Sequence, residues 1–314
     1  MNYTVGIDLG GTVIKIGLLQ SGNLIGQKNI EAYAGAGLKN QLPPIVSSID
    51  ELLNSAQVLP TQVSGLGFAF AGLVDSDEQR ILSTNKKYDD GPEIDLLAWA
   101  REQWGWPLFA LNDARMALLG EWQYGAAKGY SDVVLMTLGT GIGSAVLINN
   151  ELLIGKHFQA GNLGGHLVIN HRGSRCKCGN YGCAEAEASS WRLPDLIRSH
   201  AKFTESHLFA APSLDFKSLL HWVAGGDEVA LDIYHHCLSA WSAVLVSLVH
   251  AYDPQVIVLS GGIMHGAHLL LPVLQTNLNQ RAWTPWGKVQ LLQAKHVDSA
   301  ALYGADYLVR SKII

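Results

Sequence analysis

The chain has 314 residues, of which 48% are hydrophobic and 16% are charged, and its formal net charge is −5. A chain of this length and apolar content can bury a substantial core and forms two domains more naturally than one. The sequence has no basic tract that suggests nucleic-acid binding and no acidic block that suggests a disordered tail. Its longest apolar runs are broken by Gly, Thr or Ser, so neither a transmembrane helix nor a membrane partner is expected.

The first residues, MNYTVGIDLGG, pass directly into an alternating strand pattern. We therefore expect neither a signal peptide nor a DNA-binding helix-turn-helix before the first domain. Three of the four cysteines lie within eight residues, a metal-type cluster that suits a reducing cytoplasm better than a disulfide framework. Cys237 is interpreted as a buried thiol on a helix, and the protein is expected to be cytoplasmic.

Two strand-like runs at the start of the chain are joined by Gly10-Gly11, which predicts a hairpin. Asp8 interrupts the apolar strand just before this turn. Backbone N–H groups at a glycine turn can surround a phosphate, and Thr12 and Lys15 add a hydroxyl and a positive charge nearby. The alternative is an ordinary tight turn with a surface lysine, and this turn by itself does not decide between the two.

The same pattern of strand, glycine turn and strand returns over residues 135–148. A shift of 129 positions without a gap places Gly10 on Gly139 and the LIG of 24–26 on that of 153–155. Few identities are involved, so chance is an alternative, but an internal duplication is the more economical interpretation. It predicts two similar α/β domains that face each other across a cleft, each with one glycine turn.

Between the two turns, the apolar spacing predicts helices over 44–53 and 94–103 and a strand over 63–70. Residues 72–75 follow that strand and are expected in a loop. The segment 85–93, NKKYDDGPE, is too rich in turn formers for regular structure. Downstream of the cysteines, we expect further helices and strands over 186–191, 227–252, 256–259, 289–292 and 300–310.

A short apolar strand over 107–111 is followed by Asn112-Asp113 and a helical pattern. Asp113 is therefore predicted to be the helix N-cap. Its functional interpretation is a general base. The two roles are compatible, because the carboxyl end of a strand, where a helix begins, is where open α/β sheets bind their ligands.

Residues 166–185 contain a set of zinc ligands, namely His166, Cys176, Cys178 and Cys183. Zn²⁺ takes thiolate and imidazole ligands in a tetrahedron, and a Cys₃His shell without a water position is structural rather than catalytic. Glycines between the ligands suit a chain that wraps back on a metal. The alternatives are a Cys178–Cys183 disulfide or three reduced thiols, but the CxCGxxGC spacing favours zinc.

Two glycine turns, a carboxylate at a strand end and a pocket held by zinc together suggest phosphoryl transfer from a nucleotide to a hydroxyl. In such reactions the protein positions the reactants and neutralises charge, and Mg²⁺ bridges the phosphates. A carboxylate within reach of the hydroxyl accepts its proton. The sequence contains no GxxxxGK[ST] P-loop and no protein-kinase HRD or DFG set, so neither of those architectures applies.

The strings AGNLGGH and CKCGNYGCAE resemble the signature of the ROK family, which is approximately AGExGH followed by CxCGxxGCxE. This family contains bacterial sugar kinases and sugar-responsive repressors, and the resemblance extends from Asp8 to the final helix. It implies an α/β fold of the actin and hexokinase-like type, with two ribonuclease-H-like domains and a cleft between them. We expect these domains at 1–115 with 300–314 and at 116–299, the second carrying the zinc loop 166–185.

The resemblance also implies roles for individual residues. His166 and the three cysteines would hold structural zinc, while the other ring nitrogen of His166 and the carboxylate of Glu185 would touch the sugar. The DxGGTxxK motif implies contacts with the phosphates of ATP and with Mg²⁺, and the GTGxG motif implies a second phosphate turn. These two motifs are matched by Asp8, Gly10, Gly11, Thr12 and Lys15, and by Gly139, Thr140, Gly141 and Gly143.

The Asn-Asp pair of the family matches Asn112 and Asp113, which implies that Asp113 is the catalytic base for the 6-hydroxyl of a hexose. Gly261-Gly262 match the turn beside adenosine, and the positions that line the sugar pocket include Gly72 and Asn85. The implied activity is that of an ATP-dependent hexose kinase, assembled as a homodimer or homotetramer.

The alternative is a non-catalytic sugar sensor, because some members of the family are repressors. Repressors carry an N-terminal DNA-binding extension, which is not expected here. The presence of Asp8, Lys15 and Asp113 also favours the kinase.

This chain departs from the family pattern at the glutamate of AGExGH. Aligned from the left, the glutamate becomes Asn162 and one glycine is inserted; aligned from the right, it becomes Leu163 and no polar group remains. We favour the first alignment, because an extra glycine can be absorbed as a local bulge that leaves His166 facing the pocket. An amide offers a donor where a carboxylate offers acceptors only, so the best substrate is expected to be a hexose other than plain glucose.

Overall fold

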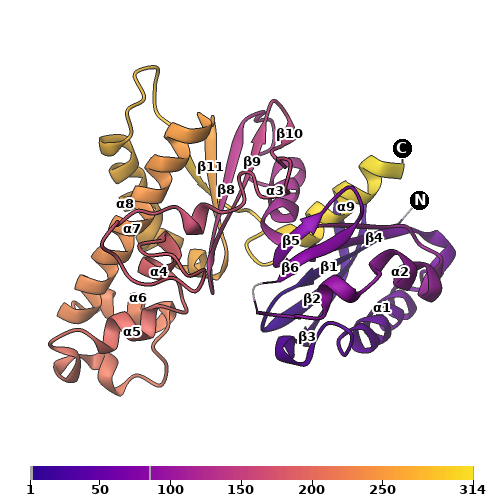
Figure 1. The fold of residues 1–314 in the computed structure, drawn as a ribbon, viewed down its shortest axis with the longest axis horizontal. Helices are drawn as coiled ribbons and strands as arrows, with labels where there is room; N and C mark the ends of the chain where they lie inside the picture. Colours follow the sequence, from indigo (N-terminus) through magenta and orange to yellow (C-terminus); the bar gives the residue numbers. More distant parts are fainter. Residues whose placement is uncertain (1–2, 85, 314) are drawn as a thin grey trace. The chain divides into compact units, whose positions relative to one another are not determined.

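The computed structural model describes residues 3–84 and 86–313, which divide into two compact units (Figure 1). Unit 1 comprises Met1–Gly129, Leu152–Ala160 and Ser299–Ile314, and unit 2 comprises Tyr130–Glu151 and Gly161–Asp298.

The expected boundary after residue 115 falls inside helix α3 (Asp113–Tyr124). Two contacts explain why unit 1 extends further. Helix α3 packs closely on the last helix, α9 (Ala300–Ile313), so closely that a Cβ atom on Gly304 would lie 1.7 Å from the carbonyl oxygen of Met116. In addition, the buried guanidinium of Arg115 donates hydrogen bonds to the carbonyl oxygens of Phe158 (2.9 Å) and Ala160 (2.8 Å).

Unit 1 is built on a five-stranded sheet with the order β3-β2-β1-β4-β7. Strands β1, β2 and β3 are antiparallel neighbours, whereas β4 and β7 continue the sheet in parallel. The strands are β1 (Tyr3–Leu9), β2 (Val13–Gln20), β3 (Asn23–Glu31), β4 (Val63–Phe70) and β7 (Leu108–Asn112). The predicted first hairpin and the strand over 63–70 are confirmed.

The two faces of this sheet carry different helices, as the alternation of side chains along a strand requires. Ile7 on β1 belongs to a core cluster shared with α1 (Leu42–Ala56) and α2 (Leu96–Trp104). Its neighbour Gly6 points the other way, where a Cβ atom would lie 3.1 Å from that of Ala305 on α9. A separate hairpin, β5 (Gly72–Asp75) and β6 (Arg80–Thr84), corrects the prediction of a loop over 72–75.

Unit 2 repeats this sheet with the order β10-β9-β8-β11-β12. Strand β8 is antiparallel to β9 and parallel to β11, as β1 is to β2 and β4, and β11 is parallel to β12. The strands are β8 (Val133–Leu138), β9 (Ile142–Ile148), β10 (Glu151–Leu152), β11 (Val256–Ser260) and β12 (Gln290–Gln293). The strand order, together with the directions of β8, β9, β11 and β12, matches that of unit 1. This match confirms the prediction of two similar α/β domains.

The longest helix of unit 2, α7 (Glu228–Tyr252), is capped by Asp227, whose side chain accepts a hydrogen bond from the backbone N–H of Ala230. It is the described helix that is long and apolar enough to cross a membrane, but 61% of its most apolar window is buried inside the protein. It is therefore a core helix. The other helices of this unit are α4 (Ala184–Ala188), α5 (Leu193–Arg198), α6 (Phe216–Ala224) and α8 (Ala267–Arg281).

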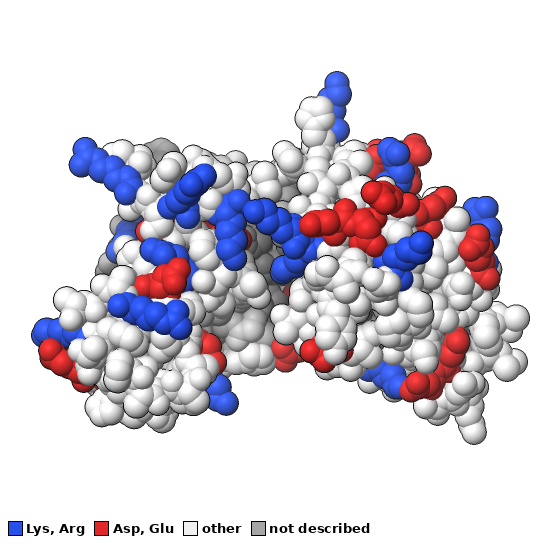
Figure 2. Space-filling model, turned by 60° about the horizontal axis from the view of Figure 1, so that its bottom comes forward, with Lys and Arg blue, Asp and Glu red and all other residues white. Residues whose placement is uncertain are grey.

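On the face drawn in Figure 2, acidic and basic side chains both occur among uncharged ones, and neither sign of charge covers the whole surface.

Candidate phosphate, sugar and metal sites

The first glycine turn joins β1 to β2 and collects the charged residues that the sequence singled out. The hairpin register pairs Asp8 with Lys15, and the ammonium of Lys15 lies 3.7 Å from a carboxylate oxygen of Asp8. The turn needs glycine at position 10, because a Cβ atom there would lie 2.4 Å from the carbonyl oxygen of Val13. The predicted grouping of Asp8, Lys15 and a glycine turn is therefore present.

Two further residues contact this turn and were missed by sequence reasoning. A Cβ atom on Gly11 would lie 2.5 Å from the ammonium nitrogen of Lys87, which therefore adds a second positive charge beside the turn. The hydroxyl of buried Tyr88 donates a hydrogen bond of 2.7 Å to the carbonyl oxygen of Gly10. Tyr88 has φ +58°, an uncommon conformation for an aromatic residue. Its segment carries only turn signals in the sequence, and these do not indicate what it folds against.

Asp113 is the first residue of α3, and the N-cap is Asn112, which corrects the predicted N-cap. Asn112 still has the extended backbone of β7, so its side-chain oxygen can accept the N–H groups of Ala114 (2.9 Å) and Arg115 (3.2 Å). Its amide nitrogen donates to the carbonyl oxygen of Gly72 (3.0 Å). Asn112 thereby fixes the position of Asp113.

The electrostatic surroundings of Asp113 suit a base. Burial, reinforced by the negative charge of Asp8, raises the pKa of Asp113 to about 6, although Lys87 and a hydrogen bond from the N–H of Ala114 oppose the rise. The pKa of Asp8 is also raised by burial, against the opposing effect of Lys15. A carboxyl group with a pKa near 6 is ionised at neutral pH and is a better proton acceptor than an ordinary aspartate.

The four predicted zinc ligands converge in unit 2. The ligand atoms of His166, Cys176, Cys178 and Cys183 all lie within 4.8 Å of one another. The sulfurs of Cys178 and Cys183 are 3.7 Å apart, and Nδ1 of His166 is 3.7 Å from the sulfur of Cys176. A tetrahedron with Zn–S bonds of about 2.3 Å separates its sulfurs by about 3.8 Å, so the donor set fits zinc.

Of the two alternatives, a Cys178–Cys183 disulfide is not formed here, because both residues are free cysteines with their sulfurs 3.7 Å apart. Three reduced thiols stay open as the other alternative to zinc. The loop that carries them turns at Gly179 and Gly182, whose φ values are +94° and +71°. The expectation that these glycines allow the chain to wrap back is confirmed.

The second glycine turn joins β8 to β9 and is contacted by Glu185. One carboxylate oxygen of Glu185 accepts the backbone N–H of Ile142 (2.9 Å), and the other accepts the indole N–H of Trp191 (3.2 Å). A Cβ atom on Gly141 would lie 2.3 Å from the first of these oxygens. The structure therefore places Glu185 against the turn, a contact that the sequence did not predict.

The other glycine positions near this turn differ in their surroundings. Gly139 and Gly262 have open space where a Cβ atom would be, whereas Gly261 has φ +91° and would place a Cβ atom 2.4 Å from the carbonyl oxygen of Leu138. Gly143 donates its N–H to the hydroxyl of Thr137 (3.1 Å). Thus Gly139 and Gly262 leave room for a ligand, and Gly261 permits close packing.

The departure from the family pattern folds as a short 3-10 helix, Gly164–His166, instead of the expected bulge. Gly164 and Gly165 both pack on β9. Cβ atoms on them would lie 2.6 Å from the hydroxyl of Ser144 and 1.9 Å from the carbonyl oxygen of Ile142, respectively.

Asn162 and Leu163, the two candidates for the missing glutamate, have opposite surroundings. The side-chain oxygen of Asn162 is buried and has no hydrogen-bond partner in the described part of the chain. Leu163 is 45% exposed. A buried unpaired oxygen is costly unless something binds it, so the structure favours the alignment that puts Asn162 in place of the glutamate.

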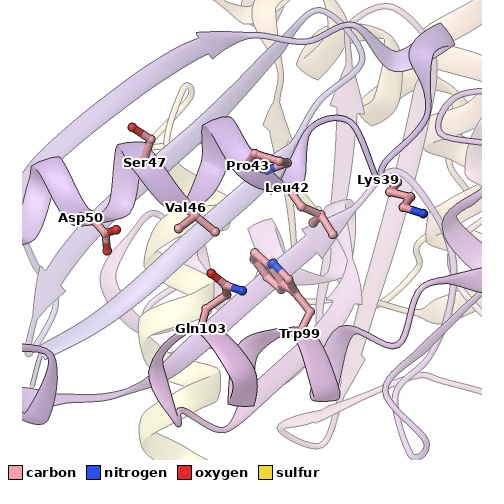
Figure 3. Close-up of a pocket in the computed structure, with 8 residues that line it drawn as sticks. All are labelled: Lys39, Leu42, Pro43, Val46, Ser47, Asp50, Trp99 and Gln103. Atoms are coloured by element: carbon pink, nitrogen blue, oxygen red, sulfur yellow. The ribbon is translucent and has the colours of Figure 1, made fainter.

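Two other expectations concern the sugar pocket. Gly72 lies on β5, where its carbonyl oxygen holds Asn112. Asn85 lies outside the described residues. A surface pocket of about 550 Å³ lies between α1 and α2 (Figure 3). Apolar and polar side chains line it in equal number, namely Leu42, Pro43, Val46 and Trp99 with Lys39, Ser47, Asp50 and Gln103. None of the predicted site residues lines it.

The repeated sheet, with a glycine turn after the first strand of each copy, defines a protein of the actin and hexokinase-like class with two domains. The chain belongs to the ROK family, whose model matches residues 4–312. It is 26% identical to a glucokinase of Thermotoga maritima, over 98% of both chains.

A ROK family glucokinase from Streptomyces griseus, solved in complex with glucose and AMPPNP, superposes with a TM-score of 0.82 at 27% identity, covering 99% of this chain and 100% of that one. A xylose repressor of Bacillus subtilis is 26% identical over 98% of this chain and 77% of the repressor.

Proposed function

We propose that the protein transfers a phosphoryl group from ATP to the 6-hydroxyl of a hexose or hexose derivative, with Asp113 as the general base. The main support is the position of Asp113 at the start of α3, with a pKa raised to about 6 by burial and by Asp8. The relatives named glucokinase support the same reaction class.

In this proposal unit 1 supplies the chemistry. Asp113 accepts the proton of the sugar hydroxyl as the phosphoryl group is transferred. Lys15 and Lys87 neutralise phosphate charge, and the glycine turn offers backbone N–H groups. Asp8 offers the carboxylate oxygens that Mg²⁺ prefers, and bound Mg²⁺ supplies further neutralisation of the phosphates.

Unit 2 would supply most of the sugar contacts. Nδ1 of His166 faces Cys176, so Nε2 is the nitrogen that would meet a sugar hydroxyl. Zinc bound to the Cys₃His set would hold the imidazole in this orientation. The buried oxygen of Asn162 and the carboxylate of Glu185 would accept hydrogen bonds from further sugar hydroxyls. Gly139, Thr140, Gly141 and Gly143, with Gly261-Gly262, would receive the nucleotide.

An asparagine at position 162 bears on the choice of sugar. Relative to the glutamate of the family pattern, it provides one acceptor fewer and a donor instead, and it has no charge. Losing a charged acceptor should weaken glucose binding by about 1.5–3 kcal/mol. We therefore propose that the best substrate is a hexose or hexose derivative other than plain glucose, with glucose as a weak substrate.

An ADP-release assay over a panel of hexoses and N-acylated hexosamines tests this function. We expect sugar-dependent ADP formation that requires Mg²⁺, and kcat/KM should be highest for a sugar other than glucose. Absence of ADP release for the whole panel, with zinc-loaded protein, would contradict the kinase.

The similarity to the xylose repressor of Bacillus subtilis supports one alternative, a sugar sensor without catalysis. Calorimetry together with the ADP-release assay distinguishes the two, because a sensor would bind a sugar without releasing ADP.

We also propose, on the strength of the family resemblance, that the protein is a cytoplasmic homodimer or homotetramer. Light scattering coupled to gel filtration would test the oligomeric state.

A further inference from the structure

The second glycine turn is wrapped by the segment that follows the zinc-binding cysteines. Ser190 donates its backbone N–H to the carbonyl oxygen of Gly139 (3.0 Å), and Trp191 donates to that of Thr140 (3.2 Å). Glu185 accepts the N–H of Ile142 from the other side. Backbone groups on both sides of the turn are thus held by seven residues of chain, 185–191.

The side chain of Trp191 fixes Glu185 in this arrangement. Its indole N–H donates to the Glu185 oxygen that does not face the turn, at 3.2 Å. The indole is itself held, because it packs against the cluster that contains Cys176 and Cys183, and the ammonium of Lys177 lies 4.3 Å from its ring centroid. An aromatic ring with contacts on several sides has little freedom to reorient.

A carboxylate has about four acceptor positions, and the N–H groups of Ile142 and Trp191 use two of them. Sugar hydroxyls can use the remaining positions without displacing either donor. The same carboxylate would then contact the sugar and the backbone of a phosphate turn. Any change in its position on binding one ligand would alter the turn that receives the other.

We infer that Trp191 is a positioning residue that holds Glu185 between the sugar and the second glycine turn, so that each ligand changes the affinity for the other. This inference rests on the proposed function for the roles of Glu185 and the turn. Such coupling is reciprocal: a sugar that tightens nucleotide binding is itself bound more tightly when the nucleotide is present.

The test is Trp191→Phe, which keeps an aromatic ring over Lys177 and removes the N–H donor. The matched control is Trp283→Phe, because Trp283 is 79% exposed and lies outside this region. Calorimetry gives the Kd of AMPPNP alone and with a saturating amount of the panel hexose that binds most tightly. Zinc content and the unfolding midpoint are measured for every variant.

In the wild type and in the control, we expect the sugar to tighten AMPPNP binding by about tenfold, within the usual range of coupling. In Trp191→Phe, this factor should fall to about threefold or less, with zinc retained and the unfolding midpoint close to that of the control. Wild-type coupling in Trp191→Phe would overturn the inference. It would also be overturned if coupling were lost only together with zinc, since the effect would then be loss of the loop.

The proposed function fails by a different result. A wild-type protein that binds both ligands with coupling but releases no ADP would refute the kinase, and loss of that coupling in Trp191→Phe would still support the role of Trp191. A wild-type protein that releases ADP without any coupling between the ligands would do the reverse.

Discussion

The two glycine turns occupy equivalent places in the two sheets but are surrounded by different side chains. The first turn is contacted by charged and hydroxyl groups, from Asp8, Lys15, Lys87 and Tyr88. The second is held through its backbone by residues 185–191. In each sheet the turn joins the first strand to an antiparallel neighbour, β1 to β2 in unit 1 and β8 to β9 in unit 2.

We propose that the repeated sheet serves two roles, one for each turn. Each sheet supplies a glycine turn after its first strand, and the side chains around that turn differ between the two copies. We assign proton transfer and charge neutralisation to the first turn and its neighbour Asp113. The second turn is assigned to nucleotide binding, and its partner Glu185 links it to the sugar.

Asp113→Asn tests the role of the first region most severely. The amide can still exchange hydrogen bonds but cannot take a proton, so kcat should fall by about 10²-fold or more. Sugar affinity measured by calorimetry should stay close to that of the wild type. Turnover near the wild-type rate would remove Asp113 from the mechanism.

Cys178→Ser tests the second region, where the predicted effect is on binding. Elemental analysis should find one zinc per wild-type chain, with the metal lost from the variant. Sugar affinity should fall by about 10–100-fold, because His166 loses the partner that orients it. Cys237→Ser is the matched control, because this buried thiol lies outside the cluster. The Cys237→Ser variant should therefore retain one zinc per chain. Metal-free protein with unchanged activity would refute the zinc site.

Asn162→Glu restores the carboxylate of the family pattern beside the zinc loop. The ratio of kcat/KM for glucose to that for the preferred sugar should rise by about tenfold or more, as expected for one charged hydrogen bond. Asn162→Ala is the companion variant and should weaken the preferred sugar. If glucose already has the highest kcat/KM and Asn162→Ala leaves it unchanged, Asn162 is not a sugar ligand.

The pH dependence of kcat/KM should report the raised pKa of Asp113. The base must be ionised, so activity should fall by about tenfold per pH unit below a pKa of about 6, instead of below about 4 for an ordinary aspartate. Because Lys87 lowers this pKa, Lys87→Met should move the acidic limb to higher pH. A limb near pH 4, or one that moves downward in the variant, would contradict the assignment.

Alanine at two glycines of the second turn separates ligand contact from turn packing. Gly139→Ala adds a methyl group in open space, so the protein should keep its stability while KM for ATP rises severalfold. Gly141→Ala pushes against Glu185 and should raise KM for both sugar and ATP. Equal effects of the two variants on both constants would argue against the contact between Glu185 and the turn.

The fold could be predicted well from the sequence because its signals are local or repeated. The glycine hairpins, the strand over 63–70 and the 129-residue shift are patterns of neighbouring residues, and the CxCGxxGC spacing gathers its ligands within one loop. The expected role of Glu185 came from the family resemblance, whereas that of Asp113 came first from its place between a strand and a helix and was then matched by the resemblance.

What was missed depends on contacts between distant segments. Lys87 and Tyr88 reach the first turn from a stretch that carries only turn signals. The bond from Trp191 to Glu185 spans only six residues, but it depends on how the chain turns after α4, which the sequence did not show. The domain boundary also moved, because Arg115 ties residues 153–160 to unit 1 by hydrogen bonds to backbone carbonyls, which no side-chain pattern reveals.

The most direct test of the central claim is the identity of the product. The preferred hexose and its 6-deoxy analogue are incubated with ATP and Mg²⁺, and the products are followed by ³¹P NMR. A sugar 6-phosphate should form with one equivalent of ADP, the 6-deoxy analogue should give none, and Asp113→Asn should lose the signal. ATP hydrolysis without a sugar phosphate, or equal phosphorylation of the 6-deoxy sugar, would contradict a hexose 6-kinase that uses Asp113 as its base.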